Sequence, residues 1–391
     1  MAINYVDQTE IKNKRVLLRV DFDVARRDDL TISDDARIQS NLPTIRLLLD
    51  GNNKVICIAK LGRPKERDPK FSLKLVVERL QQYLPEKEVL IVDDFLTDDS
   101  PLRNQTPNQI LVLENIRFYP GEKPNDPQFA DKLASYADVY VNDSFSMCHR
   151  REASIVGLPT RLPSYCGLQL KHEIDMLSKV IDNPQKPFVA IMGGAKISTK
   201  ISIVGRLNEM ADYLLIGGGL GNILLKAKGV DIGNSFIETE SVDEANKLMN
   251  ATSEKNTNMI LPEDAVVGLD KNKSESSVKK VKDIAETDAI FDIGPETQAK
   301  FGSIIAKAKT IIWNGPLGYI ENPEFKRGTD FIYYSITQNT DALSVVGGGD
   351  TLAAISNKEY LNKLSHISMG GGAMLEFIEK GTLPGIEALD K

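Results

Sequence analysis

Residues 54–64 read KVICIAKLGRP, an apolar run that stops at two cations, Lys60 and Arg63, which flank Leu61 and Gly62. A short Val/Ile run of this kind is typical of a parallel strand that is buried on both faces. Similar runs alternate with helix-like stretches along the chain. They are RVLLRVDFD, EVLIVDDF, ILVLENI and DVYVNDSF in the first half, and FVAIMGG, YLLIGGG, MILPEDAVV, AIFDIGP, TIIWNGP, LSVVGGG and HISMGGG in the second. The alternation predicts an α/β fold with parallel sheets covered by helices.

The length of the chain, 391 residues, exceeds one ordinary hydrophobic core, so two domains are expected. Between the two sets of strands, Leu170, Ile174, Leu177 and Ile181 form a helical stripe that NPQKP ends. We therefore predict two doubly wound parallel-sheet (Rossmann-like) domains joined by a linker helix, a bilobal architecture. The predicted bounds are 1–165 for the first domain, 166–185 for the linker helix and 186–375 for the second domain.

The composition excludes several classes of function. A net charge of -7 gives no global attraction to nucleic acid or to anionic membranes, so neither is expected as a partner. The chain has no signal-peptide pattern and no apolar run of membrane-spanning length. Its three cysteines are odd in number and widely spaced, so neither a disulfide framework nor a zinc site is expected. We expect a cytoplasmic protein that holds any anion with local charges.

The strand ends differ between the two halves, and ligands of open α/β sheets bind at the carboxyl ends of strands. The first half ends its strands in charged residues, namely Asp21, Asp23, Lys60, Arg63, Arg117 and Arg150. Each one alone could be a surface turn, but their coincidence favours an anion site. The second half ends its strands in glycine clusters, which suit nucleotide phosphates, although tight βα turns need glycine too. No Walker A loop is present, and GGGLGN at 217–222 lacks the last glycine of the dinucleotide pattern.

Histidine acid/base chemistry is not expected, because the chain contains only three histidines. Phosphoryl transfer between an acyl phosphate and a nucleotide fits the available residues better. The acceptor is a carboxylate or a nucleotide phosphate that is already ionised, so the reaction needs no general base. It needs charge neutralisation, alignment and exclusion of water. Arginines, lysines, backbone amides and Mg²⁺ can supply the neutralisation.

Nine segments, in order, resemble the motifs of the phosphoglycerate kinase family: RVLLRVDFD, DDARIQSNLPTI, LGRP, LENIRFYPGE, DVYVNDSFSMCHR, MGGAKISTK, WNGPLGYIE, VGGGDTLAAI and GGGAMLEFIEKGTLPG. The resemblance covers essentially the whole chain. It implies reversible phosphoryl transfer from 1,3-bisphosphoglycerate to ADP, giving 3-phosphoglycerate and ATP, by direct in-line transfer on domain closure. It implies a monomer whose first domain binds the glycerate ligand, whose second domain binds Mg²⁺ with ADP or ATP, and whose residues 376–391 return to the first domain.

The resemblance also implies roles for individual residues. The catalytic set is Arg37, Lys196, Lys200, Gly348 and Gly349. The substrate-binding set is Asp21, Phe22, Asp23, Arg37, Lys60, Leu61, Gly62, Arg63, Arg117 and Arg150. The nucleotide-binding set is Lys200, Gly217, Gly218, Asn314, Glu321, Gly348, Gly349, Asp350 and Thr351, with Asp350 as the metal ligand. Asp350 could equally be a helix N-cap.

The sequence departs from the family pattern at several of these positions. Lys60 stands where histidine is usual and Asp23 where asparagine is usual, and we hypothesise that their charges compensate each other. Ser146, Glu152 and Met369 replace a usual glycine, histidine and threonine. A catalytically weakened regulatory homologue that binds nucleotide or glycerate ligands is the first alternative, and a dinucleotide-dependent oxidoreductase is the second.

Overall fold

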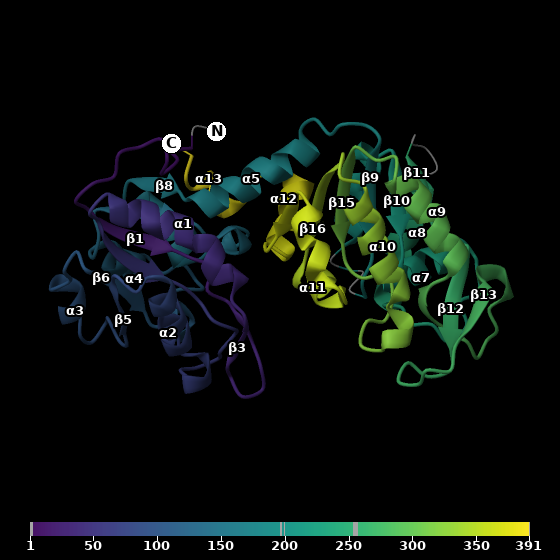
Figure 1. Ribbon diagram of the computed structural model, residues 1–391, viewed down its shortest axis with the longest axis horizontal. Coiled ribbons are helices and arrows are strands. Elements are labelled where there is room, and N and C mark those ends of the chain that lie inside the picture. The colour runs from purple at the N-terminus through teal and green to yellow at the C-terminus, as the bar shows by residue number, and fades with distance from the viewer. Residues whose placement is uncertain (1–2, 196–197, 199, 253–256, 391) are drawn as a thin grey trace. The chain divides into compact units, whose positions relative to one another are not determined.

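The computed structural model describes residues 3–195, 198, 200–252 and 257–390, and the side chains at 250–252 and 350 lie outside that description. The chain divides into two compact units (Figure 1). Unit 1 comprises residues 1–175 and 382–391, and unit 2 comprises residues 176–381. The division falls inside helix α5 (Leu168–Ile181), which lies within the range expected for a linker helix.

Unit 1 is built on a six-stranded sheet with the order β5-β6-β4-β1-β7-β8, in which every neighbouring pair is parallel. Its strands are β1 (Arg15–Arg19), β4 (Lys54–Ile58), β5 (Glu88–Val92), β6 (Gln109–Leu113), β7 (Val139–Asn142) and β8 (Ser164–Cys166). A small antiparallel pair, β2 (Ala25–Arg26) and β3 (Ile32–Asp34), follows β1. Strand β8 was not among the predicted strands, because its three residues do not form a continuous apolar run.

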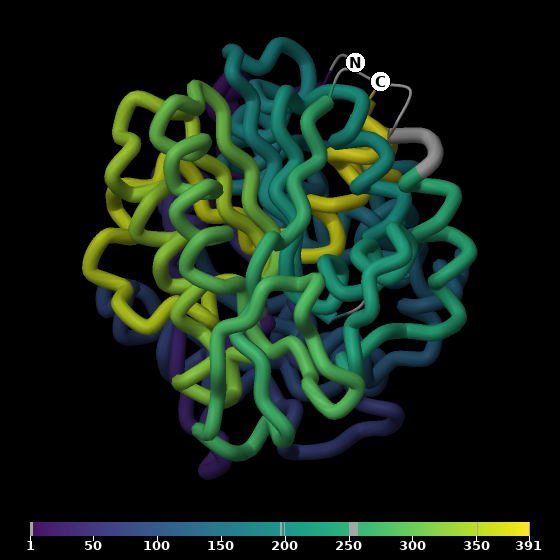
Figure 2. The backbone as a smooth tube through the Cα atoms, turned by 90° about the vertical axis from the view of Figure 1, so that its right-hand side faces the viewer, coloured from purple at the N-terminus to yellow at the C-terminus, as the bar shows by residue number. Residues whose placement is uncertain are grey.

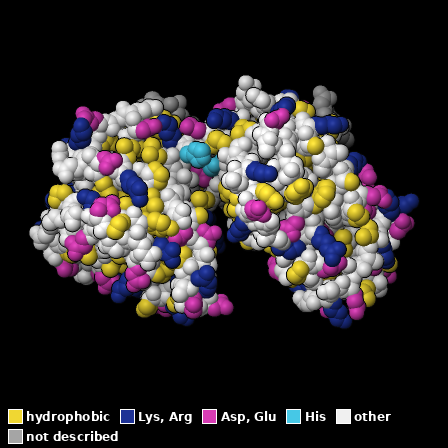
Figure 3. All heavy atoms as spheres, viewed as in Figure 1, with side chains coloured by type: hydrophobic (Ala, Val, Ile, Leu, Met, Phe, Trp, Pro, Cys, Tyr) yellow, Lys and Arg dark blue, Asp and Glu magenta, His cyan; other side chains and the backbone are white. Residues whose placement is uncertain are grey.

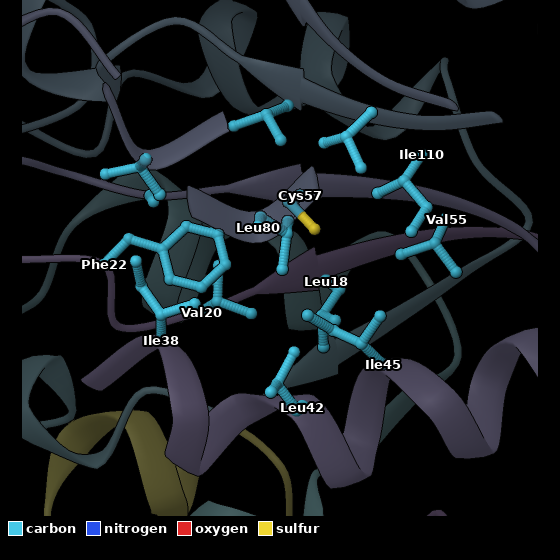
Figure 4. Packing of buried hydrophobic residues seen from close by; sticks show 14 of the residues in the cluster. Leu18, Val20, Phe22, Ile38, Leu42, Ile45, Val55, Cys57, Leu80 and Ile110 are labelled. Carbon is cyan, nitrogen blue, oxygen red and sulfur yellow. The ribbon is translucent and has the colours of Figure 1, made fainter. Parts of the chain in front are cut away.

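The helices of unit 1 cover this sheet. They are α1 (Ala36–Asp50), α2 (Lys74–Tyr83), α3 (Ser100–Arg103), α4 (Pro127–Ala134), the first part of α5, and α13 (Pro384–Glu387). The apolar stripe of α1, which includes Ile38, Leu42 and Ile45, packs on the buried residues of β1 and β4 (Figure 4). Such burial contributes about 1.5 to 3 kcal/mol for each large side chain. This packing fixes the start of α1 beside the carboxyl end of β1.

The described residues nearest the two ends of the chain lie side by side in both backbone views (Figures 1 and 2). An antiparallel bridge joins Ile3 to Asp390, and the amide of Gly385 donates to the carbonyl oxygen of Cys148 at 2.8 Å. An added Cβ at Gly385 would lie 2.7 Å from Ile155 and 2.8 Å from Cys148. The last residues of the chain are therefore closely packed on unit 1.

Unit 2 has its own six-stranded parallel sheet, with the order β11-β10-β9-β15-β16-β17. Its strands are β9 (Phe188–Met192), β10 (Tyr213–Ile216), β11 (Asn258–Ile260), β15 (Thr310–Asn314), β16 (Leu343–Gly347) and β17 (His366–Ser368). Its helices are α6 (Ile201–Met210), α7 (Gly218–Ala227), α8 (Val242–Thr252), α9 (Pro295–Ile305), α10 (Arg327–Gln338), α11 (Gly349–Ala354) and α12 (Gly372–Lys380). The predicted fold class, two parallel-sheet α/β units, is confirmed.

One part of unit 2 differs from the prediction. The runs PEDAVV and AIFDIGP were expected as parallel strands, but they form β12 (Asp264–Gly268) and β14 (Ala289–Ile293) of a separate antiparallel sheet with β13 (Ser277–Lys280). An apolar run shows that a strand is buried but not its direction, so the pattern could not separate the two cases. The glycine at 294 consequently does not lie at the edge of the parallel sheet.

Candidate active site

The first candidate half-site lies in unit 1, where the chain leaves β1 and β4. Asp21 forms an ion pair with Arg37, which lies in the first turn of α1, and Asp23 forms an ion pair with Lys60. The amide of Gly62 donates to Asp23 Oδ1 at 2.7 Å. Five expected site residues from three chain segments are thus connected. The connection follows from topology, because the carboxyl ends of adjacent parallel strands meet at one edge of a sheet.

Asp21 is buried and held from several sides. Its amide donates to Asn41 Oδ1 at 2.7 Å, and Ser146 Oγ donates to its carboxylate at 2.6 Å. Burial of the carboxyl opposes ionisation, but the charge of Arg37 and the Ser146 hydrogen bond outweigh it and hold the pKa of Asp21 below its ordinary value. Asp21 is therefore a fixed anion that sets the position of Arg37.

The two departures Asp23 and Lys60 contact each other, as the compensation hypothesis requires. Burial lowers the pKa of Lys60, and the nearby Asp23 carboxylate offsets this in part. The pair places one negative and one positive charge beside the Asp21–Arg37 pair. The four side chains together carry no net formal charge.

The three expected phosphate-binding arginines follow strands of the same sheet, but their surroundings differ. Arg63 and Arg150 are exposed, and no ion pair or side-chain hydrogen bond is found for either within the described part of the chain. The side chain of Arg117 is only 10% exposed and forms an ion pair of 2.7 Å with the buried Glu152. Two of the arginines are thus open to an anion, whereas the third already has a carboxylate beside it.

Phe22 and Leu61 belong to the hydrophobic core and not to the polar surface of the half-site. Figure 4 shows Phe22 beside Val20 and Ile38. For Phe22 and Leu61, therefore, only the backbone is available for the substrate contacts that the resemblance implies.

The second candidate half-site lies in unit 2 and is made mainly of backbone. Gly194, Gly218, Gly315 and Gly348 follow β9, β10, β15 and β16, four neighbouring strands of the parallel sheet. Their φ angles are +92°, +61°, +91° and +98°, in the region that L-residues with a Cβ rarely adopt. Glycine is therefore required by the backbone conformation at all four positions. The resulting turns leave amide groups at the strand ends, where an anion can bind.

Lys200 lies among these turns. Its Nζ donates to the carbonyl oxygen of Gly193 at 2.6 Å. An added Cβ at Gly315 would lie 2.5 Å from Lys200 Nζ and 2.3 Å from the Gly193 carbonyl oxygen, and one at Gly194 would lie 2.9 Å from Lys200 Nζ. The glycines thus also make room for the one described cation of this half-site.

Asn314 and Thr351 tie the turns together. Thr351 Oγ1 accepts from the amide of Gly315 at 2.7 Å and donates to the carbonyl oxygen of Gly347 at 2.8 Å. Asn314 Nδ2 donates to the same carbonyl oxygen at 2.8 Å. Both side chains are buried. They hold the ends of β15 and β16 at a fixed spacing.

The other expected nucleotide-site residues lie at the start of a helix, in a turn, or outside the described part of the chain. Gly217 precedes α7, Gly349 begins α11, and Glu321 is exposed in a turn after β15. Lys196 and the side chain of Asp350, the expected metal ligand, lie outside the described residues. Within the described part, no group of three or more His, Cys, Asp or Glu residues could hold a metal ion.

Sequence reasoning missed Asn41 as a site residue and treated Ser146 only as a departure. Asn41 was detectable in principle, because it is a polar residue in the apolar stripe of α1, one turn after Arg37. The Ser146–Asp21 contact spans 125 positions and has no local signal.

The surface and the helices give two general findings. On the face shown in Figure 3, acidic and basic side chains are interspersed over both units. Among the described residues, every helix is too short or too polar to span a membrane.

Comparison with known proteins identifies the family. The family model described as "Phosphoglycerate kinase" matches residues 6–381. The phosphoglycerate kinase of Dictyoglomus turgidum is 43% identical over 383 residues, which cover 97% of this chain and 96% of that protein. The phosphoglycerate kinase of Finegoldia magna is 41% identical over 386 residues, which cover 97% of each chain.

Solved structures agree with the sequence relatives. The structure of phosphoglycerate kinase from Coxiella burnetii matches with a TM-score of 0.88 and 36% identity, covering 99% of this chain and 98% of that chain. The enzyme from Pyrococcus horikoshii OT3 matches with a TM-score of 0.84, 29% identity and the same coverage. The resemblance expected from the nine motifs, and with it the kinase activity class, is confirmed: the chain belongs to the phosphoglycerate kinase family.

Proposed function

We propose that the protein catalyses reversible phosphoryl transfer between 1,3-bisphosphoglycerate and ADP, with the glycerate ligand on unit 1 and the nucleotide on unit 2. The contrast between the two strand edges carries the assignment. Charged side chains connected by ion pairs line the edge in unit 1, whereas glycines with positive φ line the edge in unit 2. Guanidinium groups suit a small phosphate, and amides at tight turns suit nucleotide phosphates.

On unit 1, we assign Arg63, Arg117 and Arg150 to the phosphate that is not transferred. Asp21 and Asp23 belong to the hydroxyl and carboxylate side of the glycerate, with Lys60 and the amide of Gly62 fixing Asp23. Arg63 and Arg150 are exposed, so a phosphate can reach them without breaking an existing ion pair. This arrangement predicts that glycerate affinity depends chiefly on the arginines.

On unit 2, we assign the amides at Gly217, Gly218, Gly348, Gly349 and Thr351, together with Lys200, to the nucleotide phosphates. Asn314 supports them, and Glu321 is assigned to the ribose. The expected metal is Mg²⁺, which proteins usually hold with one or two carboxylates and the phosphates of the substrate. Asp350 is the carboxylate that we propose for it. When bound, Mg²⁺ would neutralise charge on the phosphate oxygens.

The chemical step itself depends on charge and alignment. The acceptor oxygen is ionised at neutral pH in both directions, so no residue has to remove a proton from it. Arg37, held in place by Asp21, is assigned to the phosphoryl group in transit together with Lys196 and Lys200. Fixed cations stabilise the transition state because they need no reorganisation when the charge develops there. Direct transfer also requires donor and acceptor to come into line, which we propose happens on domain closure.

A coupled assay of ATP-dependent phosphorylation of 3-phosphoglycerate tests this function. We expect turnover that requires Mg²⁺, from a protein that is a monomer by light scattering and is found in the cytoplasm. Nucleotide binding without turnover would instead support the regulatory alternative, for which the comparisons give no support. Binding of a nicotinamide dinucleotide without affinity for ATP would support the oxidoreductase alternative.

A further inference from the structure

The ion pair between Arg117 and Glu152 differs from the other ion pairs of the glycerate half-site. Both side chains are largely enclosed, with 10% and 8% of their surfaces exposed, and their charged atoms lie 2.7 Å apart. Arg117 is one of the three arginines that we assign to the phosphate. The proposed function gives Glu152 no role in binding the glycerate ligand.

The two side chains of this pair are enclosed to a similar degree, but one atom of Glu152 is distinctive. Glu152 Oε2 is fully buried and has no hydrogen-bond partner among the described residues. One oxygen of the Glu152 carboxylate is thus shut off from solvent, whereas Arg117, which follows β6 at the carboxyl edge of the sheet, keeps a tenth of its side chain exposed.

The segment that carries Glu152 is anchored next to it. The amide of Ala153 donates to the carbonyl oxygen of Glu122 at 2.9 Å, and Ser154 Oγ donates to Glu122 Oε1 at 2.5 Å. Arg19 Nε donates to Ser154 Oγ at 3.0 Å. These contacts are all buried. They leave the backbone at Glu152 little freedom, so its carboxylate is a fixed reference point for Arg117.

We propose that Glu152 is a positioning residue for binding of the substrate phosphate: it holds Arg117 from the buried side, so that the remaining N–H groups of the guanidinium are presented to the ligand. This inference rests on the proposed function, because it takes Arg117 as a phosphate ligand. Arginine side chains lose considerable rotamer entropy when they are ordered, and a fixed carboxylate removes that cost before the ligand arrives. The carboxylate also compensates a guanidinium charge that is largely desolvated.

The test is the affinity of the full-length protein for 3-phosphoglycerate, measured by calorimetry on Glu152→Ala, Glu152→Asp and Glu152→Gln. We expect the dissociation constant to rise about tenfold in Glu152→Ala, the size of a lost charged contact. Glu152→Asp shortens the side chain and should weaken binding by roughly threefold to tenfold by displacing Arg117. Glu152→Gln keeps the length of the side chain but removes the charge that compensates Arg117, and should weaken binding by roughly threefold to tenfold. ADP affinity in the presence of Mg²⁺ should not change in any variant.

Arg117→Ala and the double variant with Glu152→Ala complete a thermodynamic cycle. If Glu152 acts through Arg117, the double variant binds 3-phosphoglycerate no more weakly than Arg117→Ala alone. The matched control is Asp131→Asn, which breaks the ion pair of Asp131 with Arg161 on the surface of unit 1 and should leave both affinities unchanged. Should Glu152→Ala not fold, the Asp and Gln variants still decide the matter.

The outcomes separate the inference from the function on which it rests. If Arg117→Ala weakens 3-phosphoglycerate binding but the Glu152 variants bind normally, the inference is wrong and the function stands. If Arg117→Ala itself binds normally, the phosphate assignment of Arg117 is wrong. Tighter binding in Glu152→Ala or Glu152→Gln would show that Glu152 competes with the phosphate, which also overturns the inference.

Discussion

The two parallel sheets each have six strands, yet different chemical groups line their carboxyl edges. The edge of unit 1 carries Asp21, Asp23, Lys60 and the arginines, and ion pairs connect several of them. The edge of unit 2 carries four glycines with positive φ and a single described lysine. A site of side chains depends on partners that are distant in sequence, whereas a site of amides depends on backbone conformations that only glycine adopts without strain. Substitutions should therefore affect the two edges in different ways.

The largest effect is expected from Arg37→Ala. Because Arg37 is assigned to charge that develops only during transfer, kcat should fall by about 100-fold to 1,000-fold, with a much smaller change in KM for 3-phosphoglycerate. Steady-state kinetics with the coupled assay measure both quantities. Arg37→Lys is the control that keeps a charge beside Asp21. A raised KM with an unchanged kcat would contradict the role.

The next largest effect is expected from Arg63→Ala. Arg63 is exposed, so its removal leaves no buried carboxylate without a partner, and the measured loss reports on the ligand alone. We expect the KM for 3-phosphoglycerate to rise by about tenfold to 100-fold. A main effect on nucleotide affinity, measured in the same series, would show that the assignment of ligands to units is wrong.

A smaller effect is expected from Gly348→Ala in unit 2. The φ of +98° strains any residue with a Cβ, and the added carbon would lie 2.9 Å from Asn314 Nδ2. Affinity for ADP should fall by about tenfold as the turn is displaced, with about 1 to 3 kcal/mol lost in stability. The fluorescence of Trp313 measures both changes during titration with ADP and during unfolding. Trp313 is the only tryptophan of the chain, and its indole N–H donates to the Gly315 carbonyl oxygen at 2.9 Å, next to the proposed site.

Gly229→Ala is the matched control for that experiment. Its φ is +83°, and an added Cβ would meet nothing within 4 Å. It therefore reproduces the backbone strain in unit 2 without touching the proposed site. Equal losses of ADP affinity in both variants would mean that the effect at Gly348 comes from general destabilisation.

The smallest effect is expected from the pair Asp23 and Lys60. Asp23→Asn and Lys60→His should each weaken 3-phosphoglycerate binding, and the double variant should recover part of the loss. A coupling energy of roughly 1 kcal/mol is expected for a contacting pair that is partly open to solvent. Strictly additive changes in the dissociation constant would refute compensation.

The sequence predicts most of the two sheets and the position of both edges, for a physical reason. Buried parallel strands leave continuous apolar runs, and the residues that follow them must lie at one edge. The antiparallel sheet of β12, β13 and β14 was not predicted, because an apolar run carries no information on strand direction. The pairing of Glu152 with Arg117 and of Ser146 with Asp21 could not be predicted either, since these contacts depend on tertiary structure and have no local pattern.

The central claim is that side chains on unit 1 bind the glycerate ligand while backbone amides on unit 2 bind the nucleotide. Titration calorimetry of 3-phosphoglycerate and of ADP with Mg²⁺ into Arg63→Ala and Gly348→Ala tests it most directly. The account predicts a crossed result, in which Arg63→Ala loses affinity only for 3-phosphoglycerate and Gly348→Ala only for ADP. Equal losses of both ligands in either variant would contradict it.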